Sequence, residues 1–268
     1  MAGTPSTDPS GNSPRPRVVP PNILWAFVLV TSLFAMWGFA NDITNPMVAA
    51  FKNILLLSYT ESALVQFAFY GGYCVMAIPA ALFIKRFSYK TGVLVGLGLY
   101  ATGCLLFIPS GWMMAFWAFL VSYFVMTCGL SFLETSANPY VLAMGPEETA
   151  TQRLNFAQAF NPIGSLTGML VAKNLILARL DTTGEEARRA LQQTSPEQFA
   201  AIRQHDLDII IGPYMALGLV VLVALVVFAV ARLPRSKGED DTSLNVGPTL
   251  RRLFRNRKYL EGVVAQTF

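Results

Sequence analysis

Apolar residues dominate six long stretches of the chain, and polar residues gather in the short intervals between them. Each stretch approaches or exceeds the roughly 20 residues that a helix needs to cross the hydrocarbon core of a bilayer. Six such segments in 268 residues argue against the buried helices of a soluble protein. We therefore predict an all-α polytopic membrane protein, with membrane helices at 23–51, 62–84, 91–108, 112–144, 154–178 and 209–231.

Composition supports this class. Only 13% of the residues are charged, about half of the roughly 25% that is usual for soluble domains. Residues 1–22 are rich in Pro, Ser and Gly, which predicts a disordered tail. The apolar segment that follows is too long for the core of a signal peptide, so we interpret it as an uncleaved first helix.

The placement of Lys and Arg predicts the orientation, because short cytoplasmic loops carry most of these residues. They gather before the first helix, at 85–90, at Arg153 and at 232–237, whereas the opposite short loops hold only Lys52. Both chain ends are therefore expected in the cytoplasm. The basic stretch 251–258 favours a linker attracted to anionic lipid over a nucleic-acid site, and no nucleic-acid partner is expected.

Two connecting regions have their own patterns. The outer loop 180–208 carries both charge signs, and "SPEQ" predicts a helix start with Ser195 as N-cap and Gln198 closing a capping box. We expect short amphipathic helices that cover the outer surface. A polar linker follows at 233–258, and residues 259–268 have the pattern of a seventh helix cut short, which indicates a fragment.

Cysteine and histidine offer little chemistry. Cys74, Cys104 and Cys128 fall inside predicted helices at no metal-ligand spacing, which favours small packing residues. His205 is the only histidine and lies in the polar outer loop. We expect no enzyme activity, no metal and no cofactor.

A weak internal repeat relates the first three helices to the last three. In an inverted three-plus-three repeat, which builds many transporters, helix one pairs with helix four and helix two with helix five. In helices one and four, Asp42 matches Glu134, and Asn45-Pro46 matches Asn138-Pro139. In helices two and five, Gln66 matches Gln158, and Gly72 matches Gly164.

The two acids of the repeat are expected near the bilayer midplane. Each lies roughly 10 residues, or about 15 Å, from the end of its helix, provided that the first helix continues through Pro46. A carboxylate at this depth costs roughly 2.5–3.5 kcal/mol and usually marks a path for an ion or substrate. Because desolvation disfavours its charged form, we expect Glu134 to take up a proton near neutral pH. The alternatives are a purely structural hydrogen bond for Glu134 and, in a kinked helix, a shallower position for Asp42.

Amides near these acids suit a polyhydroxylated ligand. Gln158 and Asn161 are three residues apart and share a helix face. Sugar hydroxyls need several donors and acceptors, and an aromatic ring covers the apolar face of a sugar. The aromatic candidates are Trp37, Tyr70, Tyr73 and Tyr140, although residues of this kind more often serve in packing or as interfacial anchors.

Three motifs together, "WGFANDITNP", "LETSANPY" and "RLNFAQAFN", resemble the fucose permease branch of the major facilitator superfamily. The resemblance implies a twelve-helix transporter of the bacterial inner membrane that imports a hexose or deoxyhexose with a proton by alternating access. Residues 23–232 would form its N-terminal six-helix half, followed by the linker and the start of helix seven. The partners implied are the sugar, the proton, the lipid bilayer and the absent C-terminal half.

The resemblance also implies a site. Glu134 matches the family's proton-linked glutamate, but the family's acid in helix one falls on Asn45, which cannot titrate. Either Asp42, three residues earlier, takes its place, or Glu134 alone carries the proton. "NDxTNP" is closer to the glucose- and galactose-transporting members, so fucose is not required. The expected sugar-binding residues are Trp37, Asn41, Asp42, Asn45, Asn138, Gln158 and Asn161.

Two further interpretations remain open from the sequence. Some relatives couple transport to sodium, so a sodium-coupled sugar transporter fits the same motifs. A six-helix chain could also be a non-transporting membrane scaffold.

Overall fold

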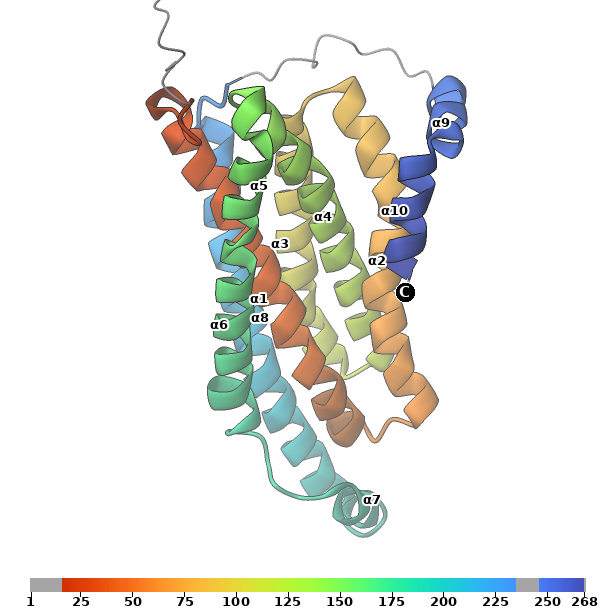
Figure 1. Ribbon diagram of the computed structural model, residues 1–268. Helices are drawn as coiled ribbons and strands as arrows, with labels where there is room; N and C mark the ends of the chain where they lie inside the picture. Colours follow the sequence, from red (N-terminus) through yellow and green to blue (C-terminus); the bar gives the residue numbers. More distant parts are fainter. Residues whose placement is uncertain (1–15, 235–245, 268) are drawn as a thin grey trace, which may run out of the picture.

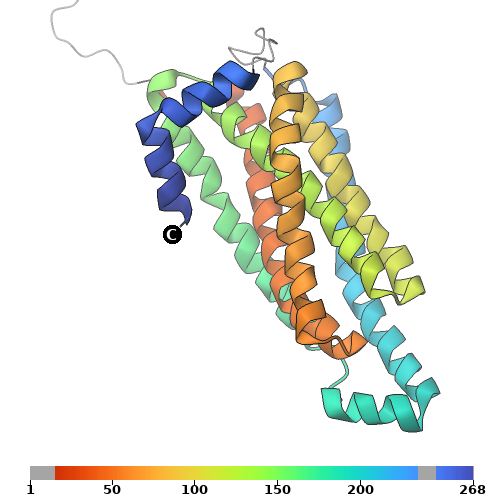
Figure 2. The same ribbon diagram turned by 90° about the vertical axis from the view of Figure 1, so that its right-hand side faces the viewer.

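A computed structural model describes residues 16–234 and 246–267, and the regular elements of this part of the chain are helices. The long helices run side by side and form one elongated bundle (Figures 1 and 2). The helices in chain order are η1 (Pro21–Ile23), α1 (Leu24–Leu55), α2 (Tyr59–Arg86), α3 (Tyr89–Met113), α4 (Phe116–Ala143), η2 (Glu147–Thr149), α5 (Ala150–Gln158), α6 (Phe160–Val171), η3 (Ala172–Leu177), α7 (Glu185–Thr194), α8 (Pro196–Val230), α9 (Val246–Arg255) and α10 (Arg257–Thr267).

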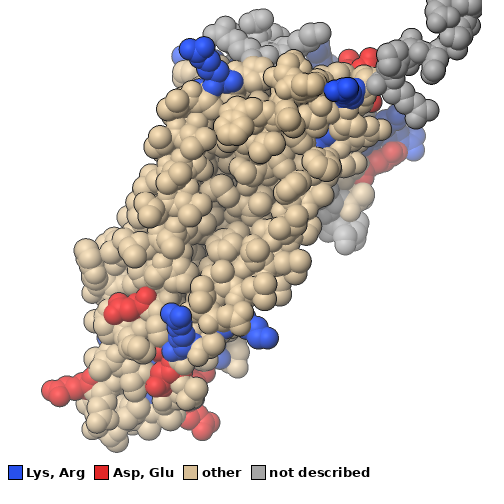
Figure 3. Space-filling view, turned by 90° about the vertical axis from the view of Figure 1, so that its left-hand side faces the viewer, with Lys and Arg blue, Asp and Glu red and all other residues tan. Residues whose placement is uncertain are grey.

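Five of the described helical segments are long and apolar enough to cross a membrane, and they belong to α1, α2, α3, α4 and α8. The charged side chains on the face drawn in Figure 3 gather near the two ends of the bundle and leave a broad uncharged surface between them. α1 continues through Pro46, as the depth argument required. The gathering of charged side chains near the two ends of the bundle is typical of a protein embedded in a bilayer, whose centre excludes charged side chains.

The segment predicted at 154–178 is not one continuous helix. It consists of α5, α6 and the wider turns of η3, which together form a single rod along the bundle (Figure 1). The first interruption follows Gln158, four residues before Pro162. Proline has no N–H for the carbonyl four residues earlier, and its ring clashes with that carbonyl. The bundle therefore has the six predicted rods, with the fifth one broken.

Two helix starts differ in how they are capped. α2 begins at Tyr59, where Ser58 and Glu61 form a capping box with a Ser58 N–H to Glu61 Oε2 distance of 2.8 Å. At "SPEQ", by contrast, Ser195 makes no side-chain cap, so the predicted capping box is wrong. The backbone of Ser195 explains the difference, since it also closes α7 and does not take the usual extended cap conformation.

The outer loop is also organised differently. Residues 196–208 are not a separate short helix but the first turns of α8, which continues without a break to Val230. The only separate helix within 180–208 is the amphipathic α7, which lies at the end of the bundle away from α5 (Figure 1). α7 is fixed to this end by buried Arg188, which pairs with buried Asp206 of α8 at 2.6 Å.

Helix pairing follows the internal repeat. α1 packs along α6, which is a contact between membrane helices one and five. α2 packs along α4, which is a contact between helices two and four. The repeat pairs helix one with four and helix two with five, so it converts one contact into the other. A Cβ on Gly164 would overlap the Ala35 carbonyl of α1, and a Cβ on Gly72 would overlap Thr127 of α4. One sequence offset relates Gly72 to Gly164 and also Ala35 to Thr127. The two close helix crossings are therefore equivalent.

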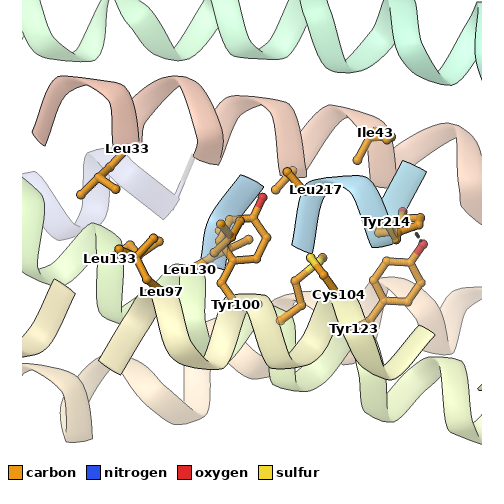
Figure 4. Packing of buried hydrophobic residues seen from close by; sticks show 14 of the residues in the cluster. Leu33, Ile43, Leu97, Tyr100, Cys104, Tyr123, Leu130, Leu133, Tyr214 and Leu217 are labelled. Carbon is orange, nitrogen blue, oxygen red and sulfur yellow. Dashed lines mark hydrogen bonds between the residues drawn. The ribbon is translucent and has the colours of Figure 1, made fainter. Parts of the chain in front are cut away.

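The core between α1, α3, α4 and α8 is apolar and aromatic (Figure 4). The hydroxyl groups of Tyr123 and Tyr214 form a hydrogen bond with an oxygen–oxygen distance of 2.8 Å, so each polar group has a partner within the core. Cys104 and Cys128 are buried, as expected of packing residues. Cys74 is exposed on α2, so the packing interpretation fails for this residue.

Arg153 is fully buried rather than a loop charge. Its guanidinium donates to the carbonyls of Val141 and Leu142, both at 2.8 Å, and to the carbonyl of Val18 at 3.3 Å. These carbonyls include orphan acceptors at the C-terminal end of α4. Arg153 therefore ties the start of helix five to the end of helix four and to the segment that precedes helix one.

Gly164→Ala tests the α1–α6 crossing. The added methyl group meets a backbone carbonyl, so the helices must separate, and we expect destabilisation by about 1–3 kcal/mol. The control is Gly98→Ala, where a Cβ meets no atom within 4 Å. This substitution should be neutral or stabilising, because Ala is the better helix former. Apparent melting temperatures in detergent compare the two variants, and equal values would contradict the close crossing.

Candidate functional site

A cavity of about 450 Å³ lies between α1, α2 and α4 and combines carboxylates, an amide and aromatic rings. Such a mixture of a few polar groups among aromatic walls is typical of small-molecule sites. α1 contributes Trp37 and Asn41, which are four residues apart and share a helix face, together with the adjacent Asp42. The described lining residues are Trp37, Asn41, Asp42, Phe69, Tyr70, Tyr73 and Glu134.

The two acids of the internal repeat line the same cavity. Asp42 comes from α1 and Glu134 from α4, and both side chains are half-buried. None of the ion pairs in the described part of the chain includes either carboxylate. An acid held within a bundle without a cationic partner is available to a proton or a ligand.

Asp42 is held by a hydroxyl group from helix five. Ser165 of α6 donates its hydroxyl hydrogen to Asp42 Oδ2. Pro46 follows four residues later and has no N–H for the backbone carbonyl of Asp42, so this carbonyl is also released from the helix ladder.

The aromatic wall is joined across two helices. Trp37 Nε1 of α1 donates to the Tyr73 hydroxyl of α2 at 2.7 Å. Phe69 and Tyr70 lie one turn earlier on α2, and their ring centroids are 5.4 Å apart in an edge-to-face arrangement. Rings fixed in this way offer a rigid apolar surface next to the polar groups.

Three of the predicted amide residues lie elsewhere. Asn138, Gln158 and Asn161 are not among the described residues that line the cavity. Asn138 donates to the Glu134 backbone carbonyl at 3.1 Å and accepts from Gln158 at 3.1 Å. Asn161 donates to the Phe34 carbonyl at 3.3 Å. In this arrangement the three amides join neighbouring helices or satisfy backbone groups.

Of the predicted site residues, the cavity brings together Trp37, Asn41, Asp42 and Glu134. Asn45 lies within α1, but its side chain is outside the described part of the structure. Sequence reasoning considered Tyr70 and Tyr73 only as general aromatic candidates and did not identify Phe69 or Ser165. The repeat contained a signal for Ser165, because the offset that relates Asp42 to Glu134 also relates Tyr73 to Ser165.

A larger hollow of about 890 Å³ runs between α1, α6 and α8. Its walls are mainly apolar, and its charged residues, Arg179 and Asp208, are exposed near the α7 end. A mainly apolar groove on a membrane protein suits lipid chains, whereas a sugar needs several donors and acceptors. The smaller cavity is therefore the better candidate for a sugar site.

Comparison with known proteins places this geometry in a family. Residues 26–266 match the Major Facilitator Superfamily. The chain is 50% identical over 254 residues to the L-fucose-proton symporter of Haemophilus influenzae, covering 94% of this chain and 59% of that protein. It is 35% identical to the glucose/galactose transporter of Brucella abortus, covering 84% of this chain and 50% of the relative.

A solved structure agrees with the sequence comparison. The crystal structure of the Escherichia coli fucose:proton symporter superposes with a TM-score of 0.77 at 33% identity, covering 91% of this chain and 58% of that chain. The chain thus spans between half and three fifths of the length of these relatives. On these matches and on its all-helical fold, the chain belongs to the Major Facilitator Superfamily, in the fucose permease branch.

Proposed function

We propose that this chain is the N-terminal six-helix half of a transporter that moves a hexose or deoxyhexose together with a proton. The observation that carries the proposal is the cavity in which Asp42 and Glu134, from repeat-related helices, face Trp37 and the aromatic residues of α2. Relatives named as fucose-proton symporters and as glucose/galactose transporters support the substrate class.

The cavity residues have chemically distinct roles in this proposal. The Trp37 ring covers the apolar face of the sugar, and Asn41 and Asp42 bind its hydroxyl groups as donor and acceptor. Glu134 takes up and releases the proton, because desolvation makes its charged form costly. Asn45, Asn138, Gln158 and Asn161 complete the set of sugar contacts that we propose, the last three after the helices have moved.

Transport requires two six-helix halves that alternately expose the site to either side of the membrane. We propose that a C-terminal half contributes the facing wall of the cavity, and that residues 246–267 lead towards it. The positive-inside pattern supports cytoplasmic chain ends in a bacterial inner membrane. Residues 1–15 and 235–245 lie outside the described structure, so the predicted tail and linker remain predictions there.

A reconstitution experiment tests this function. The chain is joined at its linker to the C-terminal half of the Haemophilus influenzae relative, and the assembled transporter is placed in proteoliposomes. We expect an inward proton gradient to drive accumulation of at least one of L-fucose, D-glucose and D-galactose. A sodium gradient without a pH difference should drive none. Accumulation driven by the sodium gradient alone would show that the coupling ion is sodium and not the proton. The absence of uptake under either gradient would contradict sugar transport.

A further inference from the structure

The two acids of the cavity have hydroxyl-bearing neighbours at equivalent places in the internal repeat. Ser165 of α6 donates to Asp42, and Tyr73 of α2 lines the cavity together with Glu134. The sequence offset from Asp42 to Glu134 equals the offset from Tyr73 to Ser165. Ser165 contacts Asp42 directly, and Tyr73 shares the cavity with Glu134. In both cases the hydroxyl group comes from the helix that packs closely along the helix of the acid.

The helix crossing fixes this neighbour in place. Gly164 directly precedes Ser165 and lets the backbone of α6 contact Ala35 of α1. Gly168, one turn further along α6, packs against Phe39 in the same way. Because α6 cannot slide or rotate far at so close a crossing, the Ser165 hydroxyl stays within reach of the Asp42 carboxylate.

The hydrogen bond occupies one of the two carboxylate oxygens. Ser165 takes Asp42 Oδ2, whereas the Asp42 side chain also lines the cavity. A hydroxyl donor to an ionised acceptor is one of the stronger hydrogen bonds. Such a bond restricts the rotation of the carboxylate before the ligand arrives, and this lowers the entropy lost on binding.

We propose that Ser165 is a positioning residue that orients the Asp42 carboxylate towards the cavity, so that its second oxygen accepts a hydroxyl hydrogen from the sugar. The inference rests on the proposed sugar transport and assigns Asp42 to sugar binding. The repeat counterpart of Ser165 is Tyr73, whose hydroxyl oxygen accepts a hydrogen bond from Trp37. Glu134 remains the proton carrier in this proposal.

Kinetics of the assembled transporter test the proposal. Ser165→Ala should raise the KM for the sugar about tenfold, with kcat and the accumulation ratio unchanged. Ser165→Thr retains the hydroxyl group and should restore most of the affinity. The matched control is Thr167→Val on the same helix, because the Thr167 hydroxyl donates to carbonyls of its own helix, those of Ile163 and Gly164. This control should leave KM within about twofold of the unsubstituted protein.

A double-mutant cycle separates positioning from a direct role. If Ser165 acts through Asp42, Ser165→Ala should have no further effect on KM in an Asp42→Asn background. An unchanged KM for Ser165→Ala would overturn the inference, and so would a full tenfold rise in that background. Sugar uptake by the unsubstituted transporter shows which idea has failed. Its absence contradicts the proposed function and the inference, whereas normal uptake with an unaffected Ser165→Ala variant contradicts the inference alone.

Discussion

Glu134→Gln in the assembled transporter is expected to abolish accumulation of the sugar against its gradient while exchange across the membrane continues. Glutamine keeps the size and hydrogen-bonding capacity of the side chain but cannot exchange a proton at neutral pH. With one proton carried per sugar, a pH difference of one unit corresponds to about 1.4 kcal/mol, or a tenfold concentration ratio. We expect this ratio to fall to about one in the variant.

Two uptake assays in proteoliposomes measure the effect. The first records the steady-state internal sugar concentration under an imposed pH gradient, and the second records exchange of labelled for unlabelled sugar without a gradient. Glu147→Gln is the control, since Glu147 is exposed and lies outside the cavity. A tenfold accumulation ratio that persists in Glu134→Gln would contradict the proton role of Glu134. In that case Asp42→Asn becomes the decisive variant, because Asp42 is the other acid that lines the cavity.

Asp206→Ala should open the end of the bundle at which α7 lies. Asp206 is fully buried, accepts from Arg188 at 2.6 Å and also accepts the backbone N–H of Asp181 at 2.9 Å. Its removal leaves the buried Arg188 guanidinium with the longer contact to Asp181 at 3.7 Å in place of its close, buried partner. Breaking a buried ion pair in this way typically costs about 3–5 kcal/mol. Because the pair joins α7 to α8, we expect the loss mainly as local opening of residues 181–195.

Hydrogen exchange followed by mass spectrometry measures this opening directly. The amides of α7 should lose protection in Asp206→Ala, while those of α3 and α4 keep it. Arg189→Ala is the matched control. It removes the exposed Arg189–Glu185 pair, and exposed pairs contribute only about 0–1 kcal/mol. Replacing both buried partners by apolar residues, as in Arg188→Met with Asp206→Leu, should recover much of the protection, and equal loss in all three variants would contradict the argument.

The sequence predicted the bundle well, because membrane helices depend on local properties. A bilayer core offers no hydrogen-bonding partners, so a long apolar stretch must form a helix wherever it crosses. The continuation of α1 through Pro46 and the six rods follow from this requirement. The break after Gln158 has an equally local cause in Pro162. The continuous α8 shows that the polar residues 196–208 join the helix of the apolar segment that follows them.

The capping motifs show where local prediction fails. Ser58 and Glu61 form a capping box, but Ser195 and Gln198 do not, although both motifs have the required residue types. Ser195 also ends α7, and the tight connection between two helices sets its backbone angles. A motif fixes which hydrogen bonds are available, and the neighbouring elements determine which of them form.

The sequence by itself determined the family motifs, the six apolar rods and the equivalent positions of Asp42 and Glu134 in repeat-related helices. Which side chains meet was decided only by the tertiary structure. Asn138 and Gln158 pair with each other rather than line the cavity, and Ser165 binds Asp42 from a helix far away in the sequence. The physical reason is that depth follows from counting residues along one helix, whereas contact depends on how two helices rotate and approach. That approach is set by close crossings such as Gly164 against Ala35, which no single segment specifies.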